Sequence, residues 1–370
     1  MRGVAVLGST GSIGRSTLDV LRRQREHFRL IALAARQDRA GLAGQVREWR
    51  PAFAGLTDGD GADGLAFGPQ VLIEAATHPD VDIVVNAVVG SVGVDATLAA
   101  LRAGKRVALA NKESLVMAGD LMVAVARESG GEIIPVDSEH SAILQCIGGR
   151  ERACRIILTA SGGPFREWDP GRVAAATVRE ALNHPTWTMG RKISVDSATL
   201  ANKALEIIEA HHLFGLPYDA LDAVVHPQSI VHAFVEFSDG SVMAQLGFPS
   251  MELPILYALT HPARLPDSGV RRFDPVAAGP LTFEPVRSEI FRAYHCGIAA
   301  GRAGGTAPAV YNAANEESVA AFLRGEVPFG RISHLIERVL DNHVVEPATS
   351  IETVRAADGW ARRRVREILQ

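Results

Sequence analysis

The sequence predicts an α/β protein: an N-terminal doubly wound parallel sheet, a central α+β domain and a C-terminal helical domain. Short apolar runs alternate with helical patterns over residues 1–136, which is typical of βα units. Residues 137–261 hold a second group of strand-like runs, and residues 288–370 are helical in pattern. A chain of 370 residues also exceeds the size at which one core keeps growing, so several domains are expected.

The expected elements follow in chain order. The first domain should contain strands at residues 4–7, 30–34, 53–56, 83–87, 106–110 and 132–136. The central domain should contain strands at 156–159, 223–225, 230–237 and 242–246. Five prolines between 262 and 285 predict an extended connection over residues 262–287. Helices are expected at 288–300, 308–324, 331–341 and 350–369, separated by Gly301, Gly325 and Pro347.

The composition favours a cytoplasmic enzyme that acts on a small molecule. Lys and Arg number 38 against 42 Asp and Glu, a net charge of -4, which leaves no basic excess for a nucleic acid or an anionic membrane. No apolar run is long enough to span a bilayer, and the first strand begins too close to Met1 for a targeting segment. Cys146, Cys154 and Cys296 form no Cys-x-x-Cys pair and are expected to be buried thiols in a reducing compartment.

A glycine-rich loop lies between the first strand and the first helix. It reads Gly8-Ser9-Thr10-Gly11-Ser12-Ile13-Gly14. Glycines allow a backbone to approach a pyrophosphate, and the helix N-terminus offers free N–H groups. A tight turn would also use glycine, but the strand–loop–helix context favours a dinucleotide site in a Rossmann-like domain.

The end of the second strand favours NADP over NAD. Arg36 and Gln37 follow it, and no acid stands at its tip to hold a ribose 2′-hydroxyl. Arg36, with Arg39 in reserve, could pair with a 2′-phosphate, the alternative being a solvated arginine. Asp38 works against this preference because its charge repels a phosphate.

Two carboxylates, Asp137 and Glu139, flank Ser138 after the strand at 132–136. In extended chain an i, i+2 pair points to one side, and two such carboxylates repel unless a cation lies between them. A hard cation, Mg²⁺ or Mn²⁺, is therefore expected, whereas zinc is disfavoured because no His/Cys cluster has ligand spacing.

Residues 194–209 predict a helix with Ser197 as its N-cap and Gly215 as its end. Asn202, Glu206 and Glu209 share its polar face, and taken alone the segment favours a solvated face. The alternative, a functional face, is supported by hydroxyl, amide and ammonium groups that could donate to a phosphate. They are Ser161, Ser197, Asn202 and Lys203.

The loop-like residues 183–190 contain Trp187. Two interpretations remain open: a lid whose indole covers the substrate, or a connection whose Trp lies in the core.

A set of short motifs extends along almost the whole chain. They are residues 8–14 above, Ala110-Asn111-Lys112-Glu113-Ser114, Val136-Asp137-Ser138-Glu139-His140-Ser141, Thr159-Ala160-Ser161-Gly162-Gly163-Pro164-Phe165, Asn202-Lys203 through Glu206, His226-Pro227-Gln228-Ser229 and Asn312-Ala313-Ala314-Asn315-Glu316. Through these motifs the chain resembles, nearly end to end, the 1-deoxy-D-xylulose 5-phosphate reductoisomerase family.

The resemblance implies a role for each site residue. Metal ligands would be Asp137, Glu139 and Glu206, which with Lys112 would be catalytic. Substrate contacts would come from Lys112, Ser138, Glu139, Ser161, His184, Trp187, Met189, Ser197, Asn202 and Lys203. Cofactor contacts would come from Gly8, Ser9, Thr10, Gly11, Ser12, Ile13, Gly14, Arg36, Gln37, Ala87, Asn111, Glu113 and Gly190.

The implied reaction makes 2-C-methyl-D-erythritol 4-phosphate for the non-mevalonate isoprenoid pathway. A divalent cation, Mg²⁺, Mn²⁺ or alternatively Co²⁺, chelates substrate oxygens while the carbon skeleton rearranges, and NADPH then reduces the aldehyde. A homodimer is also implied.

Two other classes of function stay open. One is an NADP-linked dehydrogenase of another small phosphorylated or hydroxylated substrate, which would need no triple-carboxylate site. The other is a nucleotide-sensing scaffold without turnover.

Overall fold

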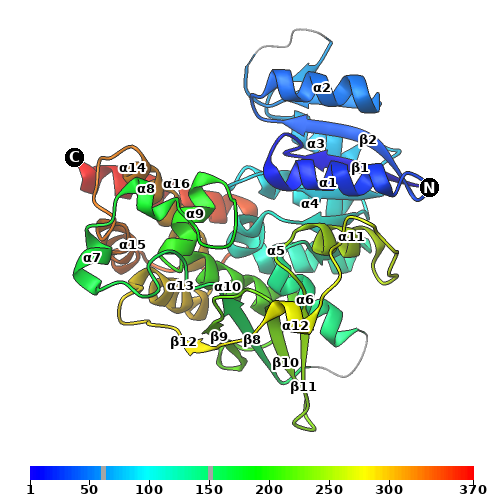
Figure 1. Cartoon of the computed structure of the whole chain (residues 1–370). Helices are drawn as coiled ribbons and strands as arrows, with labels where there is room; N and C mark the ends of the chain where they lie inside the picture. Colours follow the sequence, from blue (N-terminus) through cyan, green and yellow to red (C-terminus); the bar gives the residue numbers. More distant parts are fainter. Residues whose placement is uncertain (60–63, 149–152) are drawn as a thin grey trace. The chain divides into compact units, whose positions relative to one another are not determined.

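A computed structural model describes residues 1–59, 64–148 and 153–370 (Figure 1). The chain forms two compact units, each assembled from three segments. Unit 1 comprises Met1–Ser114, Met122–Leu144 and Ser250–Arg272. Unit 2 comprises Leu115–Leu121, Gln145–Pro249 and Phe273–Gln370. The functional boundaries at 136, 261 and 287 remain a prediction.

Unit 1 is built on a parallel sheet of seven strands in the order β4-β3-β2-β1-β5-β6-β7. The strands are β1 (Arg2–Leu7), β2 (Phe28–Ala35), β3 (Phe53–Leu56), β4 (Ala66–Phe67), β5 (Ile83–Asn86), β6 (Arg106–Leu109) and β7 (Glu132–Pro135). All six predicted strands are present, and the doubly wound sheet is confirmed. The strand order reverses at β1, between β2 and β5, which is where ligands bind in such sheets.

The helices that begin in unit 1 are α1 (Ser12–Arg23), α2 (Arg39–Trp49), α3 (Val71–Thr77), α4 (Gly93–Arg102), α5 (Lys112–Ser129), α6 (Ser138–Ile147) and α11 (Glu252–Thr260). Helix α11 was not expected from the sequence. Its residues from Pro254 to Thr260 are all buried, so the segment has no polar face and no helical periodicity to detect. Ile255 and Leu259 join the core of unit 1, and Arg2 donates to the Leu259 carbonyl at 2.6 Å.

Unit 2 contains a mixed sheet in the order β11-β10-β8-β9-β12. Its strands are β8 (Arg155–Ala160), β9 (Leu221–Val225), β10 (Val231–Glu236), β11 (Val242–Leu246) and β12 (Glu284–Pro285). The strands β8 and β9 are parallel and the other pairs are antiparallel. The four predicted strands are found. The predicted extended connection also contains β12 and the short helix α12 (Pro275–Ala278).

The other helices of unit 2 are α7 (Pro170–Ala174), α8 (Val178–Ala181), α9 (Arg191–Ala198), α10 (Ala201–Phe214), the 3₁₀ turn η1 (Tyr218–Ala220), α13 (Arg292–Ala303), α14 (Ala307–Leu323), α15 (Arg331–Asp341) and α16 (Ile351–Leu369). The four predicted C-terminal helices are confirmed, although α13 begins four residues later than expected. Among the helices described, none is both long and apolar enough to cross a membrane.

One prediction about the cysteines is wrong. Cys146 is buried and Cys296 is partly buried, but Cys154 is exposed. Cys154 lies directly before β8, at the end of that strand, where its thiol donates to the Glu236 carbonyl at 3.3 Å and stays exposed.

A buried polar bridge joins α9 to α14. The Asn315 side-chain amide donates to one Asp196 oxygen at 2.8 Å, and Lys192 pairs with the other at 2.9 Å. Asn315 is 0% and Asp196 1% exposed, so water cannot replace a lost partner.

We expect Asn315→Ala to lower the free energy of unfolding by about 1–3 kcal/mol, because it leaves part of a buried carboxylate unsatisfied. Urea denaturation followed by tryptophan fluorescence measures this loss. The exposed Asn342 provides a control. Its side chain donates to the Arg338 carbonyl at 2.6 Å, but water can replace this partner, so Asn342→Ala should cost less than about 1 kcal/mol. Equal values for the two variants would contradict the importance of the bridge.

Candidate functional site

The glycine-rich loop of unit 1 is sterically tight. Gly8 has a φ of 80°, and a Cβ added there would lie 2.6 Å from the Ala87 carbonyl oxygen. A Cβ on Gly14 would lie 2.3 Å from the Gly8 carbonyl oxygen. Helix α1 follows with Gly11 as its N-cap and no side chain capping its first N–H groups. The loop has no room for a side chain at Gly8 or Gly14, and the first N–H groups of α1 are free to donate. Both features suit the binding of a pyrophosphate.

Helix α2 holds the loop in place through Gln45. Ser9 donates to the Gln45 side-chain oxygen at 2.7 Å, and the Gln45 amide donates back to the Ser9 carbonyl at 2.9 Å. The role of Gln45 was not expected from the sequence, since no local pattern relates it to residue 9. The remaining loop residues, Thr10, Ser12 and Ile13, lie at the turn and the start of α1.

Arg36 and Gln37 are exposed directly after β2. Arg36 Nε donates to Asp58 at 2.7 Å while 79% of its side chain stays accessible. Asp38 is the N-cap of α2, and its carboxylate accepts the Gly41 N–H at 2.9 Å. The charge of Asp38 is therefore already partly balanced by a helix N-terminus, and Asp is a common N-cap residue in sequence.

Asn111 is buried beside the carboxyl ends of β5 and β6. Its amide nitrogen lies 3.0 Å from the carbonyl oxygens of both Val88 and Gly90, and 2.9 Å from the Glu113 carboxylate. Asn111 thereby fixes the turn that follows Ala87. Ala87 itself lies against Gly8 of the glycine-rich loop.

The two predicted carboxylates of unit 1, Asp137 and Glu139, lie at the start of α6. Lys112, the first residue of α5, forms an ion pair with Asp137. Asp137 also accepts the Glu139 N–H at 3.3 Å, and Ser138 donates to Glu139 at 2.6 Å. The predicted extended geometry is wrong here, because β7 ends at Pro135 and α6 begins at Ser138. Both carboxylates instead gather at a helix N-terminus, which stabilises negative charge.

In unit 2, a turn after β8 carries Ser161. Gly162 and Gly163 have φ values of 82° and 66°, a conformation that favours glycine. Ser161 Oγ accepts the Gly163 N–H at 3.2 Å and lies 2.9 Å from His184 Nε2. A Cβ on Gly163 would lie 2.7 Å from the Ser197 carbonyl oxygen, so this turn contacts the last turn of α9 directly.

The predicted N-cap role of Ser197 is wrong. Ser197 lies inside α9, and α10 begins only after Leu200, whose φ of 57° breaks the two helices apart. Leu200 is 3% exposed, so burial of its side chain compensates for the strained backbone. The predicted end at Gly215 is confirmed, with a φ of 68°.

The solvated polar face expected for α10 is also wrong. Glu206 is 1%, Lys203 3% and Glu209 3% exposed, since helices and the β8–β9 strands surround α10 within unit 2. Asn202 and Lys203 both contact the Glu206 carboxylate. Buried charges are uncommon unless paired, and such a cluster points to a functional site.

Residues 183–190 form an irregular segment between α8 and α9. Trp187 and Met189 are half-buried on it, and Gly190, the N-cap of α9, is exposed. His184 accepts the backbone N–H groups of Thr186 and Trp187 at 3.1 and 2.9 Å, which gives the segment a defined bend.

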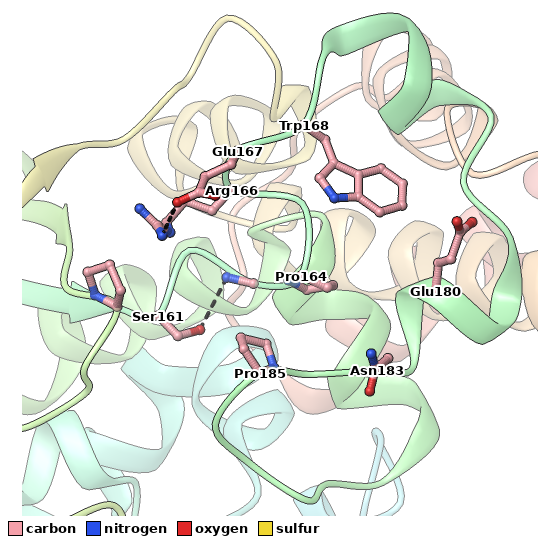
Figure 2. Close-up of a pocket in the computed structure, with 10 residues that line it drawn as sticks. Ser161, Pro164, Arg166, Glu167, Trp168, Glu180, Asn183 and Pro185 are labelled. Carbon is pink, nitrogen blue, oxygen red and sulfur yellow. Dashed lines mark hydrogen bonds and ion pairs between the residues drawn. The ribbon is translucent and has the colours of Figure 1, made fainter.

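A cavity of ≈ 410 Å³ lies beside Ser161 (Figure 2). Its lining residues are Ser161, Gly163, Pro164, Arg166, Glu167, Trp168, Glu180, Asn183, Pro185 and Pro227. Arg166 pairs with Glu284 at 2.5 Å and also with Glu167, so its charge is balanced on the cavity wall.

Burial lowers the pKa of His184 to about 4 from its usual 6.5. The folded state then resists protonation that the unfolded state accepts, so stability present above pH 6.5 is lost as the pH falls toward 4. We expect the free energy of unfolding of His184→Gln to fall less than that of the parent between pH 6.5 and pH 4. Urea denaturation of both proteins at pH 7 and pH 4.5 measures the difference, and parallel losses would contradict the assignment.

The fold and site define a class: dinucleotide-binding enzymes with a second unit that carries buried carboxylate, ammonium and hydroxyl groups. Three family models match the chain. They are 1-deoxy-D-xylulose 5-phosphate reductoisomerase over residues 4–119, its C-terminal domain over 133–214 and the DXP reductoisomerase C-terminal domain over 246–364. The chain belongs to the 1-deoxy-D-xylulose 5-phosphate reductoisomerase family.

Individual relatives agree with this assignment over their full lengths. The 1-deoxy-D-xylulose 5-phosphate reductoisomerase of Geobacillus sp. (strain WCH70) is 46% identical, covering 100% of both chains. The Zymomonas mobilis enzyme in complex with NADPH has a TM-score of 0.91 at 41% identity, covering 100% of this chain and 99% of that one. A DOX-P reductoisomerase in complex with NADPH, fosmidomycin and magnesium has a TM-score of 0.92 at 37% identity, covering 100% and 98%.

Proposed function

We propose that the protein converts 1-deoxy-D-xylulose 5-phosphate to 2-C-methyl-D-erythritol 4-phosphate, using NADPH and a divalent cation, in the non-mevalonate isoprenoid pathway. The observation that carries this proposal is the match of the chain to this family over its full length.

NADPH fits the loop at residues 8–14 of unit 1. The uncapped start of α1 would receive the pyrophosphate, and Arg36 with Gln37 would meet the 2′-phosphate end. Ala87, Asn111 and Glu113 of unit 1 would also contact the cofactor, and the resemblance to the family implies the same role for Gly190.

A divalent cation fits the donor set of Asp137, Glu139 and Glu206, because hard cations prefer carboxylate oxygens. When bound, Mg²⁺ or Mn²⁺ supplies Lewis-acid stabilisation of the oxyanion charge that develops on the substrate. Lys112 is held beside Asp137, where its ammonium would orient substrate oxygens and stabilise negative charge.

The substrate's phosphate would be held by Ser161, Ser197, Asn202 and Lys203, which together supply hydroxyl, amide and ammonium donors. Ser138 would contact the sugar oxygens. Trp187 and Met189 on the 183–190 segment would cover the bound sugar and exclude water from the reacting carbons.

We further propose a cytoplasmic homodimer with neither a nucleic-acid nor a membrane partner. The outer strand β11 supports a second copy as the partner, since Val242 and Met243 are 55% and 37% exposed at the edge of the sheet. Light scattering on the purified protein tests the dimer.

The direct test follows NADPH absorbance with purified protein, 1-deoxy-D-xylulose 5-phosphate and Mg²⁺ or Mn²⁺. We expect oxidation that stops on addition of EDTA and that does not occur with the unphosphorylated sugar. Oxidation insensitive to EDTA would favour a plain dehydrogenase, and NADPH binding without turnover would favour a nucleotide sensor.

A further inference from the structure

His184 makes hydrogen bonds that fix the position of its proton. Its Nδ1 accepts two backbone N–H groups, from Thr186 at 3.1 Å and from Trp187 at 2.9 Å. A ring nitrogen that accepts hydrogen bonds carries no hydrogen, so in the neutral ring the proton is on Nε2. The bend of residues 184–187 therefore selects one tautomer.

This tautomer makes His184 a donor to Ser161. Nε2 lies 2.9 Å from Ser161 Oγ, and the Gly163 N–H donates to the same oxygen at 3.2 Å (the dashed line at Ser161 in Figure 2). A hydroxyl has two acceptor positions and one proton to donate. With both acceptor positions used, the hydroxyl proton of Ser161 must point to a third partner.

We propose that His184 is a positioning residue that acts through Ser161, making its hydroxyl a dedicated donor to a phosphate oxygen of the substrate. This inference rests on the proposed function, which places the phosphate at Ser161. It assigns His184 a route of action that differs from direct contact with the phosphate, and it links the bend of residues 184–187 to the phosphate site.

The protonation state of His184 supports the arrangement. Burial holds the pKa of the ring at about 4, so the ring stays neutral near neutral pH and Nδ1 keeps its acceptor role. A hydroxyl that can only donate suits a phosphate dianion, whose oxygens only accept.

Two substitutions separate the two nitrogens of the ring. In His184→Asn, the side-chain oxygen replaces the Nδ1 acceptor and the Nε2 donor is lost. In His184→Gln, the side-chain amide replaces the Nε2 donor and the Nδ1 acceptor is lost. We expect exchange of the Thr186 and Trp187 amides to accelerate in His184→Gln and to stay near the parent rate in His184→Asn.

A double-mutant cycle with Ser161→Ala tests the relay, using inorganic phosphate as the probe and calorimetry on the full chain. We expect Ser161→Ala to weaken phosphate binding about tenfold, as for one charge-assisted hydrogen bond. His184→Asn should lower the affinity for phosphate several-fold when Ser161 is present, and should not change it in the Ser161→Ala background. His184→Gln should restore most of the affinity that His184→Asn loses.

The outcomes distinguish the two levels of inference. If His184→Asn costs the same in both backgrounds, His184 contacts phosphate independently and the relay is overturned, while the phosphate site stands. If Ser161→Ala has no effect, the proposed phosphate site itself fails. The parent protein gives a direct check, because ¹⁵N NMR of the imidazole ring must show the Nε2–H form, and an Nδ1–H form would overturn the proposal without any variant.

Discussion

Glu206→Gln is expected to lower turnover of 1-deoxy-D-xylulose 5-phosphate by about 10³-fold, because a cation site contributes several kcal/mol of transition-state stabilisation. Glutamine keeps the size of glutamate but removes its charge, which weakens cation binding. It also removes the buried ion pair of Glu206 with Lys203, one of the proposed phosphate donors. Weaker cation binding and a displaced Lys203 would both lower turnover.

Steady-state assays over a range of Mg²⁺ concentrations measure this loss, with NADPH affinity as an internal check on folding. Glu209→Gln is the matched control, because Glu209 is a buried carboxylate of the same helix that is assigned no ligand role. Similar losses in both variants would show that any buried charge change in α10 suffices, and would argue against Glu206 as a ligand.

Gly14→Ala is expected to weaken NADPH binding about 100-fold. The added Cβ would lie 2.3 Å from the Gly8 carbonyl oxygen and 2.6 Å from Ser9 Cα, both backbone atoms that cannot rotate away. The loop must therefore move by a substantial fraction of an ångström, and misplacement on the scale of 1 Å costs about 10²-fold in well-fitted sites.

Fluorescence titration with NADPH measures the effect. Gly44→Ala in α2 is the control. Among the described residues, a Cβ there would have only the Arg47 side chain nearby, at 3.9 Å, and alanine favours helix. Unchanged NADPH affinity in Gly14→Ala would place the cofactor away from this loop.

Elements with a clear local pattern were predictable from the sequence. The apolar strands of the first sheet and helix α15, found at Arg331–Asp341 as expected, carry their signal within a few residues. Helix α11 does not, because it is apolar on every side, and β4 and β12 are only two residues long. The fold class followed from the first group of elements alone.

The candidate site was predictable in residue type but less so in geometry. Asp137, Glu139 and Glu206 were identified as carboxylates for a cation, yet Glu139 proved helical and the Glu206 face proved buried. The first error is local, because β7 ends at Pro135 and α6 begins at Ser138. The second error arises because the burial of a side chain depends on elements distant in sequence. Dependence on distant elements also hid the roles of Gln45 and Asn315, whose partners lie 36 and 119 residues away.

The division of the chain into two units, each made of three separate segments, affects how such a protein can be altered as a gene. Residues 115–121, inside helix α5, belong to unit 2 although the residues on both sides belong to unit 1. No single cut of the coding sequence therefore releases either unit whole. Recombination between related genes would have to exchange three segments together to transfer one unit, so the nucleotide-binding part cannot be acquired or discarded as a cassette.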